Sequence, residues 1–498
     1  MREPVDWPTQ DLVSHRVAST PERPAVVDAD GDPTWRYREL DDRVDTVAAR
    51  FAAETGSAGG ENERVAALVD TRVEIAPLLF GAMRAGVALV PLNVGLEPAT
   101  LAAQLARVDP GLLVCERGTE RTAREIADCP VVSVDEPRSE GVVPLAIDRA
   151  PPDPVALSRT DEQVVLFTSG TTSDPKGVRI TVGNLVASAT ASAFRLGVRP
   201  DDRWLVALPT YHMGGLAPFL RGALYGTTVV VQRSFDPNGT AAVMDESDVT
   251  GVSLVPTMLA RLLDAGWKPP ESLRTVLLGG GPADETLVDR CRDAGVPVHP
   301  TYGMTETASQ IATARPQTAF DHPGTVGQPL VFTEVTVVDD GSPCEPGERG
   351  ELVVDGPTVT PGYLDDERTA AAFGSHGLHT GDLGYRDEDG RLWIVGRVDD
   401  RIVTGGENVV ASDVAATIRE NGDVTDAVVV GVPDEEWGQR VAALVTGTVS
   451  AGAVRDYCEA RLAPYEVPKT IRVVDTLPRT ASGTVDREAA RALVDGSE

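Results

Sequence analysis

Short apolar runs alternate with helix-like stretches through residue 301. After an aromatic strand at 34–37, residues 39–54 place apolar side chains at helical spacing, so we expect one face of this helix to be buried. The residues of this face are Leu40, Val44, Val47, Ala48 and Phe51. Strand-like runs occur at 65–70, 87–92, 111–116, 204–209, 227–232, 251–256, 275–280 and 296–301. Their alternation with helices predicts an α/β fold built on parallel sheets.

The pattern changes near residue 325 to short strands separated by Gly, Pro and Asp turns, as in GELVVDGP and GRLWIVGR, which predicts a small antiparallel subdomain. The last hundred residues predict a compact α+β unit. Its helices are expected at 411–421 and 451–462, and its strands at 426–432, 440–447 and 470–475. We therefore predict a large N-terminal domain, residues 1–397, and a small C-terminal domain, residues 398–498.

The charge balance is strongly acidic, with 76 acidic against 45 basic residues and a net charge of −31. Such a chain repels nucleic acid and anionic membrane surfaces, so neither is an expected partner. An acidic, arginine-rich surface with few lysines is typical of proteins that work in concentrated salt, where the Debye length falls to about 3 Å. A high-GC genome would also favour arginine over lysine.

The five cysteines are scattered and have no CxxC spacing, which argues against a disulfide framework or a zinc site. The first residues lack the apolar segment of a signal peptide, and we expect a cytoplasmic protein. The longest apolar stretch, 75–96, contains Arg84, Pro77 and Pro91, so we interpret it as a buried helix and strand rather than a membrane span. We expect no membrane insertion.

The stretch VVLFTSGTTSDPKGV, residues 164–178, combines an apolar strand with a loop of hydroxyls, glycines and one lysine. Such a loop can wrap a polyphosphate, because glycine lets backbone N–H groups approach the anion while the lysine neutralises charge. It is not a Walker loop, since Lys176 precedes its glycine. A solvated turn is the alternative. The candidate phosphate-binding residues are Thr168, Ser169, Gly170, Thr171, Thr172 and Lys176.

Further polar or glycine-rich segments follow predicted strands, where ligands bind in open α/β sheets. YGMTET begins at Tyr302, and its Glu306 offers a hard oxygen ligand suited to Mg²⁺, although a Thr/Glu pair can equally cap a helix. His212 follows another strand, and a lone histidine is usually structural. Asp382 lies in a GD pair that could be an ordinary turn.

Taken together, these motifs resemble the adenylate-forming superfamily, which includes acyl-CoA synthetases, luciferases and adenylation domains. The chain departs from TSGTTGxPKG only at Ser173, and YGMTET, GDLGYRDEDGRLWIVGR and DDRIVTGGENV follow in the family's order. The resemblance implies ATP, Mg²⁺ and CoA as ligands. PTYHMGGL, LLGGGPA and YGMTETASQ are most similar to the 2-succinylbenzoate–CoA ligases of menaquinone biosynthesis.

Roles within the N-terminal domain follow from this resemblance. Tyr302 and Gly303 are expected near adenine, Thr305 at the α-phosphate and Glu306 on Mg²⁺. Asp382 and Arg397 are expected to bind the ribose, and Gly280 and Gly281 to complete the ATP site. His212 is expected to gate the acyl pocket. The other acyl-pocket residues are Gly214, Arg221, Gly279, Ser309 and Gln310, of which Arg221 could instead lie at the surface or behind the pocket.

In the C-terminal domain, the resemblance places a hinge at Asp399 and a passage for the CoA arm at Gly405 and Gly406. The domain is expected to swing between two orientations. The family pattern LPRTxSGKxxR carries a catalytic lysine, whereas this chain has Thr484 at that position. A lost positioned cation costs several kcal/mol in a transition state, so another cation must substitute or adenylation is slow. The nearby candidates are Arg487, Arg479 and Lys469.

We therefore predict an AMP-forming acid–CoA ligase whose preferred acid is 2-succinylbenzoate. One alternative is a ligase for another aryl or fatty acid. A second is a catalytically weak nucleotide-binding homologue, suggested by Thr484. The expected partners are a small carboxylic acid, ATP and CoA. The sequence leaves open whether the protein is a homo-oligomer.

Overall fold

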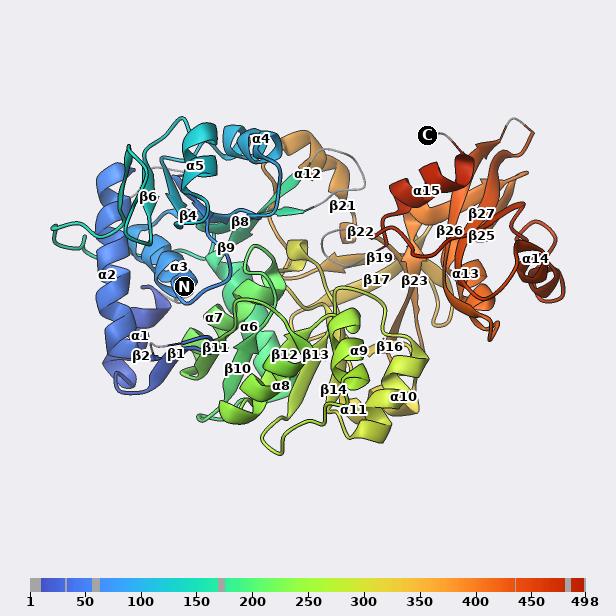
Figure 1. The fold of residues 1–498 in the computed structure, drawn as a ribbon, viewed down its shortest axis with the longest axis horizontal. Helices are drawn as coiled ribbons and strands as arrows, with labels where there is room; N and C mark the ends of the chain where they lie inside the picture. Colours follow the sequence, from blue (N-terminus) through green and yellow to red (C-terminus); the bar gives the residue numbers. More distant parts are fainter. Residues whose placement is uncertain are drawn as a thin grey trace. The chain divides into compact units, whose positions relative to one another are not determined.

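A computed structural model describes residues 10–31, 34–55, 63–168, 175–434, 436–479 and 485–496. The chain packs as two compact units. The first unit comprises Met1–Val335 and Val354–Leu378, and the second comprises Thr336–Val353 and His379–Glu498. Figure 1 shows the chain coloured along its sequence; the first unit runs from blue to yellow and includes the orange segment with α12, and most of the second unit is orange and red.

The first sheet of the first unit has a parallel centre with one antiparallel strand at each edge. Its order across the sheet is β15 (Ala312–Thr313), β14 (Val298–Tyr302), β13 (Thr275–Leu278), β12 (Gly251–Leu254), β10 (Arg203–Val206), β11 (Thr228–Val231), β1 (Pro24–Asp28) and β2 (Thr34–Arg36). The parallel centre confirms the predicted α/β fold class, because β10, β12, β13 and β14 are among the expected strands.

The second sheet of this unit is also mostly parallel, but it ends in an antiparallel hairpin. Its order is β20 (Gly362–Tyr363), β9 (Lys176–Thr181), β8 (Glu162–Thr168), β4 (Ala88–Pro91), β3 (Arg64–Leu68), β5 (Leu112–Cys115), β6 (Val131–Ser133) and β7 (Val142–Pro144). In the sequence, β8 ends and β9 begins on either side of the predicted phosphate loop.

Helices connect these strands and cover the sheets. They are α1 (Leu12–Ser19), α2 (Tyr37–Glu54), α3 (Ile75–Ala85), α4 (Pro98–Val108), α5 (Glu120–Ile126), α6 (Val182–Leu196), α7 (Met213–Tyr225), α8 (Pro237–Glu246), α9 (Pro256–Asp264), α10 (Glu285–Ala294), α11 (Pro316–Asp321) and α12 (Asp366–Ala372). Short elements between them are η1 (Thr305–Thr307), β16 (Thr325–Gly327) and β21 (Phe373–Gly374). Helices α6 and α7 lie side by side (Figure 1).

One large core joins α2, α3 and α7 to strands of both sheets. The predicted face of α2 is buried within it, including Leu40, Val44 and Phe51. Arg84 in α3 is only 2% exposed and donates to Asp11 at 3.0 Å, with Asp41 and Asp45 as further partners. A buried arginine needs such acids because an unpaired charge is costly in a core. Residues 75–96 thus form the expected buried helix and strand.

The second unit contains a sheet with the order β23 (Leu392–Arg397), β22 (Gly377–Arg386), β19 (Arg349–Asp355), β17 (Glu334–Asp339) and β18 (Ser342–Pro343), in which β22 and β23, and also β17 and β18, pair antiparallel. The short helix η2 (Val398–Asp400) leads from it to a second sheet. That sheet has the order β25 (Glu407–Val410), β24 (Arg401–Thr404), β27 (Gly438–Gly447) and β26 (Val424–Asp434), with β28 (Thr470–Val473) paired to β27. The expected change to short antiparallel strands is therefore confirmed.

Helices cover both faces of this last sheet (Figure 1). One core contains residues of α13 (Ala411–Arg419) and α14 (Ala451–Glu459) with Val429, Val441 and Val445 of the strands. A separate core contains residues of α15 (Arg487–Asp495) with Val428 and Val430. The alternation of neighbouring valines between the two cores follows from the two-residue period of a strand.

The predicted division at residues 397 and 398 concerns domains that move independently, and it stays a prediction. In the part of the chain that the structure describes, no helix is both long and apolar enough to cross a membrane.

Candidate active site

The predicted site residues of the first sheet come together because they follow parallel strands. His212 follows β10, Gly279–Gly281 follow β13, and Tyr302 ends β14. Parallel strands place their carboxyl ends at one edge of the sheet, which is where ligands bind in open α/β folds. His212, Gly280, Gly281 and Gly303 are all exposed there, so this edge is open to a ligand.

Two paired strands border the predicted phosphate loop in the sequence, β8 before it and β9 after it. Thr168 ends β8 and is the register partner of Lys176, the first residue of β9. Five residues of this loop lie outside the described residues: Ser169, Gly170, Thr171, Thr172 and Ser173. The last of them, Ser173, is where the chain departs from the family pattern. The pairing of the two strands thus fixes the two ends of the loop, and Lys176 is part of a strand rather than of a turn.

Lys176 and Glu306 are linked through Tyr363. The Lys176 ammonium lies 5.5 Å from the centroid of the Tyr363 ring, and the Tyr363 hydroxyl donates a 3.0 Å hydrogen bond to Glu306 Oε1. Glu306 is 7% exposed and Tyr363 is 6% exposed. The backbone carbonyl of Glu306 also accepts a 2.7 Å bond from the Thr360 amide. The predicted phosphate lysine and the predicted metal ligand are therefore held in one network.

Two glycines of the site are required by their backbone surroundings. Gly280 has a φ of 75°, in the left-handed region that favours glycine. A Cβ on Gly303 would overlap the carbonyl oxygen of Ser309, so only glycine fits between Tyr302 and the following turn. Thr305 begins η1 and is half-buried, next to the buried Glu306.

His212 precedes the first turn of α7 and stays exposed. Its ring packs edge-on against Tyr211, with centroids 4.8 Å apart. Neighbouring atoms displace enough water from the ring to lower the pKa of His212 below its ordinary value, so it is neutral at pH 7. Gly214 lies in the same turn, where a Cβ would come 2.9 Å from Leu208. A neutral aromatic ring at an open edge is suited to line an acyl pocket.

Arg221 lies in α7 and is 5% exposed, so it is not a surface residue. It donates to Ser309 Oγ at 3.1 Å and to Gln310 Oε1 at 2.9 Å. Its Nε has no partner among the described residues, and burial lowers its pKa. The guanidinium carbon lies 6.0 Å from the centroid of the Trp204 ring. Three residues predicted for the acyl pocket therefore form one cluster around a buried cation.

The loop that carries Ser309 has an unusual backbone. Ala308 and Ser309 have φ values of 50° and 126°, which non-glycine residues rarely adopt. The Ala308 carbonyl accepts a 2.7 Å bond from Ser188 of α6. Such conformations persist only where surrounding contacts hold them, and they cluster at ligand sites.

Glu306 fits the demands of Mg²⁺ in an ATP site. Mg²⁺ usually keeps several waters and is bound by one or two carboxylates together with substrate phosphates. Among the described residues, no group of three or more His, Cys, Asp or Glu side chains could hold a metal without a substrate. A single oriented carboxylate that shares Tyr363 with the predicted phosphate lysine matches a metal that is bound together with ATP.

The predicted ribose residues lie in the second unit and contact each other directly. Asp382 in β22 is the register partner of Arg397 in β23, and Arg397 Nη1 donates to Asp382 Oδ1 at 2.8 Å. The same nitrogen donates to the Thr380 carbonyl at 3.2 Å. The pair holds the carboxylate in a fixed orientation, as a diol acceptor requires.

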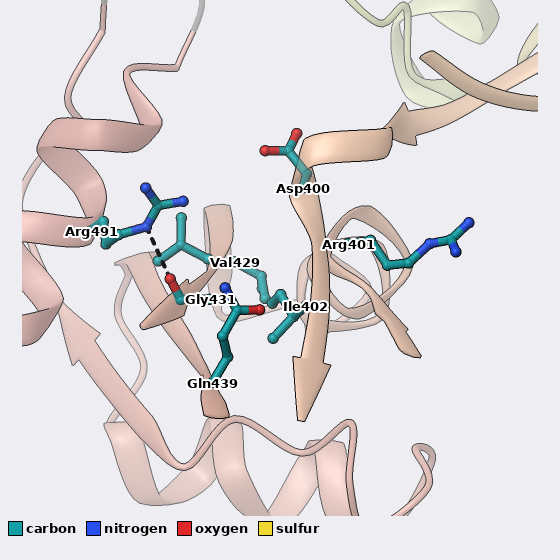
Figure 2. Close-up of a pocket in the computed structure, with 8 residues that line it drawn as sticks. Asp400, Arg401, Ile402, Val429, Gly431, Gln439 and Arg491 are labelled. Atoms are coloured by element: carbon teal, nitrogen blue, oxygen red, sulfur yellow. Dashed lines mark hydrogen bonds between the residues drawn. The ribbon is translucent and has the colours of Figure 1, made fainter. Parts of the chain in front are cut away.

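Asp399 belongs to η2, and its side chain lies outside the described residues. The residues that directly follow Asp399 line a small hollow. Its volume is about 10 Å³, which is room for about one water. Figure 2 shows its lining, with Asp400 at the end of η2, Ile402 on β24, and Arg491 donating to the Gly431 carbonyl at 2.9 Å. The hollow is too small for a substrate, so we assign it no ligand.

Gly405 and Gly406 form the turn between β24 and β25, with φ values of 60° and 87°. A Cβ on Gly405 would come 2.6 Å from the Trp437 ring, which is 41% exposed. Lys469 lies over the same ring, with its nitrogen 3.6 Å from the centroid. The hairpin and the packing of Trp437 both require glycine at position 405, independently of any CoA arm.

The candidate substitutes for the missing lysine differ in their partners. Arg487 forms an ion pair with Asp400 at 2.8 Å, and Arg479 forms one with Asp426 at 2.9 Å. Lys469 is exposed, and its partner within the described part of the chain is an aromatic ring rather than an acid. Thr484 itself lies outside the described residues. Lys469 is therefore the candidate whose charge is least neutralised.

Sequence reasoning missed Tyr363 and Trp437. Tyr363 belongs to a two-residue strand, and Trp437 precedes a glycine in a turn. The only signal in the sequence is an aromatic residue beside glycine, which is common in strands and turns.

Residues 13–364 match the family described as AMP-binding enzyme, and residues 413–484 match its C-terminal domain. The chain belongs to the AMP-binding enzyme family. The predicted superfamily is thereby confirmed, and with it the class of enzymes to which the chain was assigned.

Curated AMP-binding enzymes resemble the chain along its full length. The 2-succinylbenzoate–CoA ligase of Bacillus subtilis (strain 168) is 37% identical over 476 residues, which cover 95% of each chain. A structure of o-succinylbenzoate CoA synthetase from Bacillus subtilis in complex with the acyl-adenylate intermediate OSB-AMP has a TM-score of 0.88 at 36% identity, covering 97% of this chain and 98% of the other.

A second structure of the Bacillus subtilis synthetase contains ATP and a magnesium ion. It has a TM-score of 0.87 at 35% identity and covers 98% of this chain and 99% of the other. The predicted similarity to 2-succinylbenzoate–CoA ligases is thus confirmed at full length. The roles predicted for single residues stay predictions.

Proposed function

We propose that the protein is an ATP-dependent acid–CoA ligase of menaquinone biosynthesis that uses 2-succinylbenzoate. In the first step a carboxylate oxygen of the acid attacks the α-phosphorus of ATP, and pyrophosphate leaves. In the second step the CoA thiol, after losing its proton, attacks the acyl carbon, and AMP leaves with the attacking oxygen. The products are acyl-CoA, AMP and pyrophosphate.

The observation that carries the choice of acid is the cluster of Arg221, Ser309 and Gln310. A buried guanidinium whose described partners are neutral retains a charge that a second carboxylate of the substrate can match. Ser309 and Gln310 orient the guanidinium through their hydrogen bonds. An acid with one carboxylate for adenylation and another for Arg221 therefore fits better than a fatty acid.

On the nucleotide side, we assign Lys176 to the β- and γ-phosphates and Glu306 to Mg²⁺. The metal neutralises phosphate charge when it is bound, and the chain's own contribution is to hold one carboxylate oriented. Adenine and the α-phosphate would lie at the open edge of the first sheet. The residues that we assign to them there are Tyr302, Gly303, Thr305, Gly280 and Gly281.

For the second unit, we assign Asp382 and Arg397 to the ribose and the turn at Gly405 and Gly406 to the CoA arm. A backbone rotation at Asp399 would move residues 398–498 between the two half-reactions. This assignment rests on the motif order and on the fixed Asp382–Arg397 pair. We further propose that the enzyme works in the cytoplasm at high salt, as its charge of −31 suggests.

Thr484 supports one competing proposal, a weak homologue that binds nucleotide without efficient turnover. The two proposals predict different rates of adenylation, because a missing cation slows only the step that develops charge at the α-phosphorus. Lys469 is exposed and has no acid partner among the described residues, and it would restore this charge if it reached the site.

A panel of acids tests the proposal. Thioester formation with ATP and CoA would be measured at several salt concentrations for 2-succinylbenzoate, benzoate and a medium-chain fatty acid. We expect the highest kcat/KM for 2-succinylbenzoate. Equal values for benzoate would remove the role of Arg221, and thioester formation at background for every acid would favour the weak homologue.

A further inference from the structure

Strand register places Tyr363 close to Lys176. It pairs with Val178 of β9, and Lys176 lies two residues before Val178 on the same face of that strand. Diagonal neighbours across a strand pair are within reach of an aromatic side chain. The observed distance of 5.5 Å from the Lys176 nitrogen to the ring centroid agrees with this geometry.

The hydroxyl of Tyr363 points to a different element of the site. It donates to Glu306 Oε1 at 3.0 Å, and Glu306 belongs to η1, 57 residues earlier in the chain. A donor on one carboxylate oxygen fixes the plane of the carboxylate, as outer hydrogen bonds do for metal ligands. One side chain thus contacts the predicted phosphate lysine with its ring and the predicted metal ligand with its hydroxyl.

The short strand that carries Tyr363 is itself held firmly. Thr360 Oγ1 accepts from the Gly362 amide at 3.0 Å, and Thr369 Oγ1 accepts from the Tyr363 amide at 2.9 Å. The Leu364 amide donates to the Gly177 carbonyl at 2.9 Å. These hydrogen bonds fix the backbone at Tyr363 and on both sides of it. A residue that positions other side chains needs such a fixed backbone.

We propose that Tyr363 is a positioning residue that holds Lys176 and Glu306 in the arrangement that binds ATP together with Mg²⁺. The inference rests on the proposed function, since it assumes that these two residues serve ATP and the metal. The competing explanation is that Tyr363 only fills the core to which its ring belongs. The two explanations differ in what happens when the hydroxyl alone is removed.

Tyr363→Phe removes the bond to Glu306 and keeps the ring beside Lys176. ATP binding would be followed by calorimetry as Mg²⁺ is varied, because binding does not depend on turnover or on the acid. We expect the Mg²⁺ concentration for half-maximal binding to rise on the order of 10-fold. Binding of ATP without Mg²⁺ should not change. Tyr363→Leu should in addition weaken metal-free ATP binding by about 2- to 5-fold, because the ring beside Lys176 is lost.

Tyr37→Phe is the matched control. The Tyr37 hydroxyl is buried and donates to the Gly222 and Thr227 carbonyls at 2.8 Å each, and these bonds do not involve Lys176 or Glu306. Thermal unfolding of both variants separates stability from ligand binding. We expect Tyr37→Phe to keep the Mg²⁺ dependence of the parent even if its unfolding temperature falls.

A double-mutant cycle with Glu306→Gln decides between positioning and core filling. If Tyr363 acts on Mg²⁺ through Glu306, Tyr363→Phe should have little further effect on Mg²⁺ dependence in the Glu306→Gln background. Superimposed Mg²⁺ curves for Tyr363→Phe and the parent, or additive effects in the cycle, would overturn the proposal. A parent that binds ATP with Mg²⁺ but activates no acid would count against the proposed function alone.

Discussion

Arg221 donates a 2.9 Å hydrogen bond to Gln310 although the two residues are 89 positions apart in the chain. The bond joins the middle of α7 to the loop that follows the YGMTET motif, so it links two segments of the candidate acyl pocket. Both side chains are buried, and Gln310 is held further by its 2.7 Å bond to Thr313 Oγ1. The pocket therefore has a fixed cation rather than a flexible one.

The first prediction concerns this cation. Arg221→Leu should raise the KM for 2-succinylbenzoate on the order of 10- to 100-fold, the effect of losing hydrogen bonds to a charged group. Gln310→Glu is nearly isosteric and should raise the KM for 2-succinylbenzoate as well, because the new carboxylate would form an ion pair with the guanidinium in place of the substrate. The KM for ATP should stay constant in both. Steady-state kinetics check this, and an unchanged acid KM in Arg221→Leu would exclude the role.

Lys176→Ala should lower kcat/KM for ATP on the order of 100-fold, since it removes a positioned cation from the phosphates. Lys268→Ala is the control, because Lys268 is exposed and lies in the segment between α9 and β13. The measurement is kcat/KM for ATP of both variants, obtained from initial rates across ATP concentrations. Similar losses in the two variants would mean that Lys176 acts only through general charge.

Glu306→Gln should shift the Mg²⁺ requirement upward on the order of 10-fold, because a carboxamide is a poorer ligand for a hard cation. The rate at saturating Mg²⁺ should recover in part. The measurement is the initial rate at fixed ATP across Mg²⁺ concentrations. If the curves of the variant and the parent coincide, Glu306 does not hold the metal.

His299 predicts how stability depends on pH. It is 7% exposed, its Nδ1 donates to the Pro297 carbonyl at 2.9 Å, and burial, reinforced by Arg315, Arg195 and Arg274, lowers its pKa to about 4. The unfolded chain takes up this proton near pH 6.5, whereas the folded chain does so only near pH 4. Stability is therefore lost as the pH falls through this window, by about 3 kcal/mol from this residue.

The measurement is the free energy of unfolding of the parent and of His299→Asn from pH 7.5 to 4. The Asn amide nitrogen can replace Nδ1 without titrating, so the difference between the two proteins should shrink or reverse on acidification. Parallel curves would show that His299 does not carry this effect.

Thr484→Lys should raise acyl-adenylate formation from ATP and leave CoA transfer from preformed acyl-adenylate nearly unchanged, because the family lysine serves only the first half-reaction. Single-turnover rates of the two steps measure this. If Lys469 already supplies the charge, Lys469→Ala will slow adenylation and the gain from Thr484→Lys will be small. If Arg487 supplies the charge instead, despite its ion pair with Asp400, Arg487→Ala will slow adenylation selectively. Adenylation unaffected by any of the three changes would contradict this account of the step.

The fold was predictable where one local pattern decides each element. The buried face of α2 and the strand ends that carry His212 and Tyr302 follow from periodicity and from the rule that parallel strands align their carboxyl ends. The acyl cluster was predicted as a set because Arg221, Ser309 and Gln310 flank recognisable motifs. Their mutual hydrogen bonds required the three-dimensional packing of α7 against the loop after β14.

Tyr363 shows why the rest could not be predicted. Its strand has two residues, too few for any periodicity, and it pairs with β9 across 185 positions of sequence, from Val178 to Tyr363. The division into units also depends on distant contacts, because Thr336–Val353 packs with the C-terminal residues. Neither arrangement leaves a local signal.

Isotope transfer tests the central claim most directly. If the acid is adenylated, 2-succinylbenzoate labelled with ¹⁸O in its carboxyl groups must give AMP that carries one ¹⁸O atom, because the oxygen that attacks the α-phosphorus leaves with AMP when the thioester forms. Mass spectrometry of the AMP from a single turnover with ATP and CoA reads this out. We predict one ¹⁸O per AMP. Unlabelled AMP, or label in inorganic phosphate with ADP as the product, would contradict the account.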